Sequence, residues 1–184
     1  VIVTSAAGCT GTSAGIVTTV NANPTPGLTS SDADNIICAG TNVIFTGSGG
    51  TNYEFFVGGV SVQNGAGTTY ATTTLLNGQS VTVRVTNAAG CLATSTGITT
   101  TVNPNPIASI TSSDGDNIIC AGTSVTFTAT PAGATTYNFR VNGVSQQSGA
   151  SNIYTTTGLT NGQTVDVIVT SAAGCTGTSA GIVT

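Results

Sequence analysis

The five cysteines are the side chains of this sequence best suited to covalent chemistry: Cys9, Cys38, Cys91, Cys120 and Cys175. They lie far apart, without the Cys-x-x-Cys spacing typical of zinc sites, and the chain has no histidine. Structural disulfides are therefore favoured, with metal binding by cysteine as the alternative. Disulfides persist in oxidising compartments, so the cysteines indicate an extracellular or cell-surface protein.

An internal repeat indicates which residues belong together. Residues 1–18 recur unchanged as residues 167–184, and Asn-Ile-Ile-Cys-Ala-Gly-Thr occurs at both 35–41 and 117–123. This pattern is typical of a tandem array of modules of about 80 residues, each with one small core. We expect residues 1–23 to be the last strands of a preceding module, residues 24–105 to be one module, and residues 106–184 to be another whose last strand is cut.

The repeat predicts that each disulfide lies within one module. Cys38 and Cys91 fall in one module and Cys120 and Cys175 in the next, so we expect the bonds Cys38–Cys91 and Cys120–Cys175. Each bond closes a loop of about 50 residues, which stabilises a module by about 4 kcal/mol in the chain-entropy model. Cys9 matches Cys91 and Cys175 in its surroundings, so it is expected to be unpaired here, with a partner upstream.

A cluster of oxygen-bearing side chains that recurs in both modules could bind a cation. Its members are Asp32, Asp34 and Asn35 in the first module and Asp114, Asp116 and Asn117 in the second. Ca²⁺ needs six to eight oxygen ligands, and this local sequence supplies about half of them. An Asx turn before the cysteine is therefore favoured, with Ca²⁺ that stiffens a module junction as the alternative. No other cofactor is expected.

The remaining carboxylates are isolated and favour no catalysis. Glu54 and Asp166 are expected on outward positions of strands, and Asn138 and Thr82 replace them in the other module. General acid–base catalysis needs a cleft and a partner group, so solvated surface is the favoured interpretation and no enzymatic activity is predicted. Phe56 is expected to point outward, where contact with a neighbouring chain or ligand is an alternative to simple exposure.

The composition excludes two classes of partner. Charged residues make up 4% of the chain and the net charge is −4, with only two positive side chains. Binding to nucleic acid or to anionic lipid needs a basic surface, which this chain lacks. No apolar stretch approaches the roughly 20 residues of a membrane-spanning helix, so membrane insertion is not expected.

The elements that must position these residues are strands. Residues 124–130, 137–141 and 164–170 alternate between apolar and polar side chains, a period of two that indicates strands with one buried face. Turn signals such as Asn142-Gly143 and Asn161-Gly162 separate them. We predict an all-β fold in which each module is an immunoglobulin-like β-sandwich of about seven strands.

Three stretches of the second module carry a resemblance to a known repeat type: Thr111–Gly133, Tyr137–Gln146 and Leu159–Cys175. They resemble the immunoglobulin-like or PKD-like repeats of giant surface proteins in Bacteroidetes, similar to the gliding-motility adhesins. That resemblance implies export by the type IX system and a cell-surface or shed filament. It implies no enzymatic activity and transfers no catalytic residue.

These observations predict a structural segment of a long extracellular fibre or adhesin stalk. Its expected partners are the neighbouring repeats of the same chain, together with lateral contacts to other filament chains or surface glycans. Two alternatives stay open. One is a subunit of a non-covalent filament assembled by strand exchange. The other is a carbohydrate-binding module, for which the sequence offers no tryptophan and few exposed aromatic residues.

Overall fold

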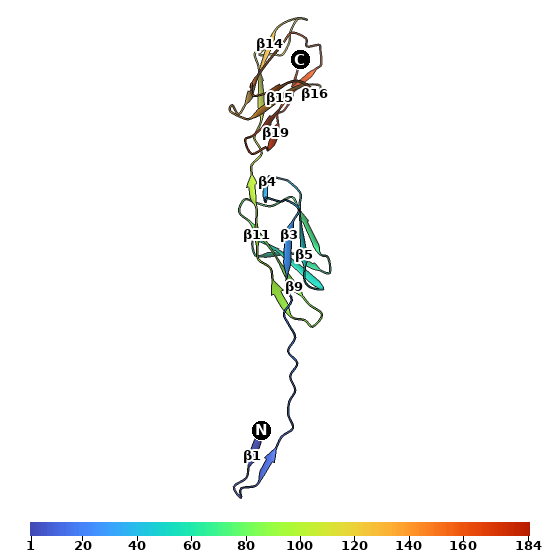
Figure 1. Cartoon of the computed structure of the whole chain (residues 1–184). Helices are drawn as coiled ribbons and strands as arrows, with labels where there is room; N and C mark the ends of the chain where they lie inside the picture. The colour runs from blue at the N-terminus through green and yellow to red at the C-terminus, as the bar shows by residue number, and fades with distance from the viewer.

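The computed structural model describes all 184 residues as an extended row of β-structure without a helix, so no helix could cross a membrane (Figure 1). Two sandwiches follow one another end to end, and a separate hairpin lies at the N-terminal end of the row. The hairpin pairs β1 (Ile2–Thr4) with β2 (Thr10–Thr12).

The first sandwich packs a three-stranded sheet against a larger one. The smaller sheet has the order β3-β5-β8, with β3 (Gly27–Ser30), β5 (Val43–Ser48) and β8 (Thr69–Thr72). The larger has the order β10-β9-β6-β7, with β11 also paired to β9. Its strands are β6 (Asn52–Val57), β7 (Val60–Gly65), β9 (Ser80–Thr86), β10 (Leu92–Thr94) and β11 (Ile98–Thr99).

The second sandwich repeats this arrangement. The smaller sheet is β13-β14-β17, with β13 (Ser109–Ser112), β14 (Val125–Thr130) and β17 (Ile153–Thr156). The larger is β16-β15-β18-β19, with β20 also on β18. Its strands are β15 (Thr136–Val141), β16 (Val144–Gly149), β18 (Thr164–Thr170), β19 (Thr176–Thr178) and β20 (Ile182–Val183). This antiparallel two-sheet architecture confirms the predicted all-β, immunoglobulin-like sandwich.

Each core is built from the inward positions of the alternating strands. In the second sandwich Val125, Phe127 and Ala129 of β14 are buried, as the alternation predicts. Phe139 of β15 packs with Val167 of β18 in the same cluster. The first sandwich has a separate cluster that includes Phe45, Phe55 and Val83. The sandwiches therefore have independent hydrophobic cores.

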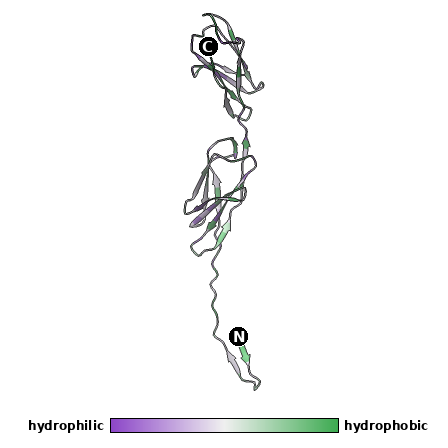
Figure 2. Ribbon diagram, turned by 180° about the vertical axis from the view of Figure 1, so that it is seen from behind, coloured by the Kyte–Doolittle hydropathy of each residue, from purple (hydrophilic) through white to green (hydrophobic).

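The N-terminal hairpin has the sequence and register of a hairpin in the second sandwich. Ile2 pairs with Thr12 in the first case and Ile168 with Thr178 in the second. Val3 is 65% exposed, whereas its repeat equivalent Val169 is completely buried. Figure 2 shows the apolar character of β1, which pairs only with β2. This hairpin carries the pattern of a core strand without a sheet facing it.

One further strand pair lies outside the two sheets of the first sandwich. β4 (Ile36–Cys38) pairs in parallel with β12 (Thr101–Asn103), the segment that leads from the first sandwich to the second. The connection between the sandwiches is thus partly a strand of the first one.

Candidate functional site: the junction between the sandwiches

A disulfide crosses the junction between the two sandwiches. Cys38 at the end of β4 is bonded to Cys175, which lies in the loop between β18 and β19 of the second sandwich. Their Cα atoms are 5.5 Å apart although 137 residues separate them in the sequence. The bond therefore fixes one end of the first sandwich to the facing end of the second.

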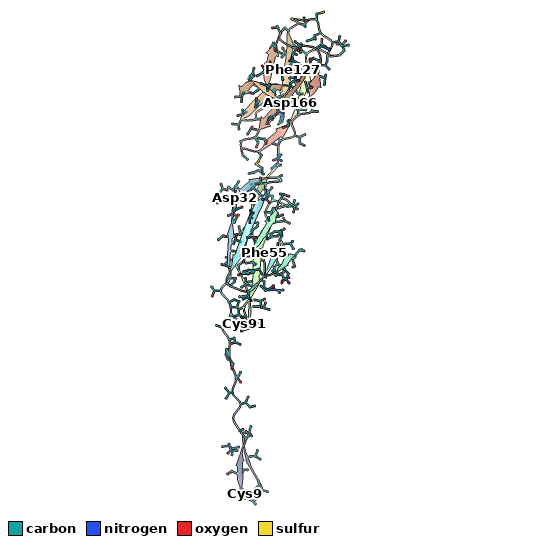
Figure 3. All side chains as sticks on the ribbon, turned by 90° about the vertical axis from the view of Figure 1, so that its right-hand side faces the viewer. Cys9, Asp32, Phe55, Cys91, Phe127 and Asp166 are labelled. Carbon is teal, nitrogen blue, oxygen red and sulfur yellow. A yellow bond between two sulfur atoms is a disulfide. The ribbon has the colours of Figure 1, made fainter.

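The predicted bonds Cys38–Cys91 and Cys120–Cys175 are wrong, because the cysteines of one sandwich lie at opposite ends. Cys38 precedes β5 and Cys91 follows β9, and the turn with Cys91 lies at the end of the first sandwich that faces the N-terminal hairpin (Figure 3). Cys38 lies at the other end, beside Asn103. A disulfide needs Cα atoms about 4.4–6.8 Å apart, which the length of a sandwich does not allow.

Backbone hydrogen bonds reinforce the junction around β12. Thr101 N–H donates to the carbonyl of Asn35 at 2.8 Å, and Ala39 N–H donates to the carbonyl of Asn103 at 2.9 Å. Val102 N–H donates to Oδ1 of Asn77 at 3.0 Å, and the Val102 side chain packs against the first core. These contacts anchor the start of the linker to the first sandwich.

The linker also contacts the second sandwich closely. Sγ of Cys175 lies 3.9 Å from the carbonyl oxygen of Asn103. A Cβ added at Gly177 of β19 would overlap the carbonyl oxygen of Pro106, so the backbones approach to a distance that only glycine permits. The prolines flanking Asn105 fix φ and favour an extended linker. Strand pairing, close packing and a disulfide thus act at one junction.

The other three cysteines are unpaired in this structure. Cys9 and Cys120 are exposed, and Cys91 is half-buried. Sγ of Cys91 lies 3.8 Å from the carbonyl of Asn21, the same contact that Cys175 makes with Asn103 at the observed junction. Cys91 therefore faces the linker that precedes its own sandwich. Cys9 is unpaired within these residues, as expected.

The repeated acidic motif forms turns. Ile36 N–H donates to Oδ1 of both Asp34 and Asp32, at 2.9 and 3.1 Å, and Asn35 has a left-handed φ of 56°. In the second sandwich Ile118 N–H donates to Oδ1 of Asp116 at 3.0 Å, with Asn117 at a φ of 57°. These are Asx-type turns, in which asparagine tolerates the left-handed conformation. The turn in the first sandwich sets the direction of the chain as it enters β4.

The carboxylates of this motif are not gathered around one point, and few of its oxygens are free of a hydrogen bond. No three His, Cys, Asp or Glu side chains lie close enough together to hold a metal ion. Within the motif, the oxygens buried without a hydrogen-bond partner are Oδ1 of Asn35 in the first copy and Oδ1 of Asp114 and Asn117 in the second, so each copy offers fewer than the six to eight oxygens that Ca²⁺ requires. The turn interpretation is the one that the hydrogen bonds support.

Each sandwich carries one cross-strand ion pair on its surface. Glu54 of β6 lies opposite Arg84 of β9 and pairs with it. Arg140 of β15 lies opposite Asp166 of β18, and its Nε donates to Oδ1 of the aspartate at 2.8 Å. The two carboxylates expected to be solvated surface are thus each paired with an arginine, which uses both positive side chains of the protein.

The hydroxyl of Ser61 contributes most to the low pKa of Glu54. It donates to Oε1 of Glu54 at 2.8 Å and, together with Arg84, holds the pKa of this carboxyl below its usual value of 4.5, against the opposing effect of burial. The guanidinium of Arg84 also lies over the ring of Phe56, with its Cζ 5.3 Å from the ring centroid. Phe56 is therefore half-buried, with a cation over its ring, rather than freely exposed.

The sequence matches no model of a known protein family and no curated protein. Similar solved structures include fibronectin(III)-like modules of Clostridium thermocellum CbhA, at 14% identity and a TM-score of 0.45, covering 84% of this chain and 92% of that one. A Bacteroides ovatus glucan-utilization protein, SGBP-B in complex with a mixed-linkage heptasaccharide, is 16% identical with a TM-score of 0.33, covering 89% and 48%. The central fibronectin-III array of RIM-binding protein is 17% identical with a TM-score of 0.31, covering 88% and 61%.

Proposed function

We propose that this chain is a structural segment of a long extracellular fibre or cell-surface adhesin stalk, in which tandem sandwiches hold a binding region away from its base. The observation that carries this proposal is the Cys38–Cys175 bond across the junction. A bond within one sandwich would stabilise that fold alone. A bond between sandwiches fixes their mutual orientation, which is a property useful to a spacer.

Because of its position, the disulfide would carry tension directly from Cys38 to Cys175 through a covalent bond. A pull on the two termini reaches Cys38 from one side and Cys175 from the other, and the sulfur–sulfur bond joins these points directly. The residues between them, which include most of both cores, are then shielded from extension by tension. Non-covalent contacts alone would let each small sandwich unfold and lengthen in turn.

The surface and the compartment also fit a stalk. Disulfides persist outside the cytosol, and a surface of Ser and Thr hydroxyls with few charges suits an exported fibre. The resemblance to repeats of Bacteroidetes gliding-type adhesins supports the finer proposal of a type IX-exported surface protein.

Single-molecule stretching between the two termini tests the load-bearing role. The oxidised chain should resist extension of the segment between Cys38 and Cys175, and reductant should release it. The expected increase in the extended length of the chain is the 137-residue separation at about 3.3–3.6 Å per residue, or roughly 450–490 Å. A Cys38→Ser/Cys175→Ser variant should extend fully without reductant, whereas Cys9→Ser should behave as the original chain. Equal extension with and without reductant would refute a load-bearing bond.

A second candidate is a filament of separate subunits joined by strand exchange. The specific observation in its favour is the uncovered apolar face of the β1–β2 hairpin, whose copy in the second sandwich is a core hairpin. Intact mass of the natural filament under denaturing, non-reducing conditions separates the candidates. A tandem stalk remains one very large chain, and a strand-exchange polymer falls to small subunits.

A further inference from the structure

A groove of about 380 Å³ lies at the end of the second sandwich, away from the junction. One wall is the segment 117–121, which contains Ile118, Ile119 and Cys120, and the other is the segment 159–161. Thr184 also lines the groove. We call this the acceptor groove.

The same place in the first sandwich is filled by β12. Segment 35–39 repeats as 117–121, and Leu75 and Asn77 correspond to Leu159 and Asn161. Between these equivalent walls lie Thr101–Asn103, held in parallel register with Ile36–Cys38. The first sandwich thus shows how a groove of this sequence is occupied.

The walls of the acceptor groove differ from their counterparts in the way that a missing strand would cause. Ile37 is 5% exposed and belongs to the first core, whereas its counterpart Ile119 is only partly buried. Ile118 is 79% exposed, against 54% for Ile36. Residues 118–120 form no strand, whereas Ile36–Cys38 is one. These residues expose an apolar surface together with unpaired backbone groups.

The hydrogen bonds of β12 show which chemistry the groove recognises. The backbone of residues 117–121 offers the same donors and acceptors that bind Thr101 and Asn103 in the first sandwich. Asn161 can accept from a backbone N–H as Asn77 does from Val102. In the first sandwich the Val102 side chain packs against the cluster that contains Ile37 and Leu75, whose counterparts Ile119 and Leu159 line the acceptor groove. An extended Thr-Val-Asn segment satisfies all three requirements.

We propose that the acceptor groove binds an extended Thr-Val-Asn segment, in parallel with Ile118–Cys120, supplied by residues that follow Thr184 in the same array. Thr184 N–H donates to the carbonyl of Gln163 at 3.0 Å, as Thr100 N–H does to that of Gln79 at 3.1 Å just before β12. The next residue would therefore enter the groove. The same order occurs at residues 13–21, where Ser-Ala-Gly-Ile-Val-Thr is followed by Thr19-Val20-Asn21.

The test compares three chains: the 184-residue protein, the protein lengthened at its C-terminus by Thr-Val-Asn-Pro-Asn-Pro, and the same extension with aspartate in place of valine. Hydrogen exchange is measured at the amide of Ala121, the counterpart of Ala39. The valine extension should slow this exchange by roughly tenfold or more, because it supplies an acceptor and excludes water. It should also protect Cys120 from alkylation.

The aspartate extension has the same length and prolines but places a charge in an apolar pocket, so it should leave Ala121 exchange as fast as in the 184-residue protein. Asn161→Ala in the valine-extended chain should weaken the protection.

Equal exchange in all three chains, or equal protection by both extensions, would overturn the proposal. Protection of the 184-residue protein that rises with its concentration would identify Thr19–Asn21 of a second copy as the occupant and overturn the same-chain source. None of these outcomes affects the stretching experiment, so the proposal for the acceptor groove and the proposal for the load-bearing disulfide are tested independently.

Discussion

At the scale of single residues, the junction depends on side chains that are small or absent. Gly177 and Gly11 occupy the same place in identical sequences, Thr-Gly-Thr, but only Gly177 faces another segment. A methyl group at Gly177 would overlap the carbonyl oxygen of Pro106, whereas one at Gly11 would meet nothing within 4 Å. Alanine substitutions at these two glycines therefore distinguish the effect of the junction contact from the effect of replacing glycine by alanine.

Gly177→Ala should therefore destabilise the second sandwich by about 1–3 kcal/mol, the usual effect of overpacking. Gly11→Ala should change stability by less than about 0.5 kcal/mol, as surface substitutions do. Denaturant unfolding followed in the second sandwich measures both. Equal effects of the two substitutions would show that the backbone contact at Pro106 does not constrain the junction.

The lowered pKa of Glu54 predicts an acid-sensitive first sandwich. A carboxyl whose pKa is lower in the folded state contributes stability above its unfolded pKa, and this contribution is lost as the pH falls through the folded value. The fall should begin near pH 4.5 and continue below it. Unfolding of Glu54→Gln between pH 2 and pH 7 should show a shallower acid loss than the original chain, and identical profiles would contradict the role of Ser61 and Arg84.

At the scale of elements, β12 is a strand of the first sandwich as well as a linker. Its hydrogen bond from Val102 N–H to Asn77 has no counterpart at Asn161, whose side chain makes no hydrogen bond in the structure. Asn77→Ala should destabilise the first sandwich by about 0.5–1.5 kcal/mol, the net value of one such bond. Asn161→Ala is the matched control and should be nearly neutral. Thermal unfolding of each sandwich distinguishes them, and equal losses would argue against β12 as an integral strand.

Most strands could be predicted from their sequence, because one face of each is buried. The alternation in β14, β15 and β18 places Phe127, Phe139 and Val167 inward, and all three are fully buried. β4 and β12 could not be predicted in this way. Each has three residues, too few for a period of two to be visible, and their pairing joins segments distant in the sequence.

At the scale of the whole molecule, the repeat correctly indicated two similar sandwiches but not the disulfide. Grouping Cys38 with Cys91 assumed that cysteines of one repeat lie together. The strand directions show otherwise, since β5 and β9 both run from the Cys38 end of the first sandwich to the Cys91 end. A residue before β5 and a residue after β9 are therefore separated by the length of the sandwich. Counting strand reversals along the sequence is the signal that could have revealed this.

The same geometry makes a prediction about cysteine reactivity. Alkylation of the denatured, unreduced protein should modify three thiols, those of Cys9, Cys91 and Cys120. Full reduction should raise the number to five. Intact-mass spectrometry counts the added groups, and a single modified thiol before reduction would instead indicate two disulfides in the chain.

The pairing itself can be tested by one digestion, because the chain has only two sites for trypsin, after Arg84 and Arg140. The protein is alkylated, denatured, digested without reductant and analysed by mass. The Cys38–Cys175 bond predicts that fragment 1–84 remains joined to fragment 141–184 while fragment 85–140 is released. Bonds within each sandwich would hold all three fragments together, and that result would contradict a disulfide across the junction and the stalk built on it.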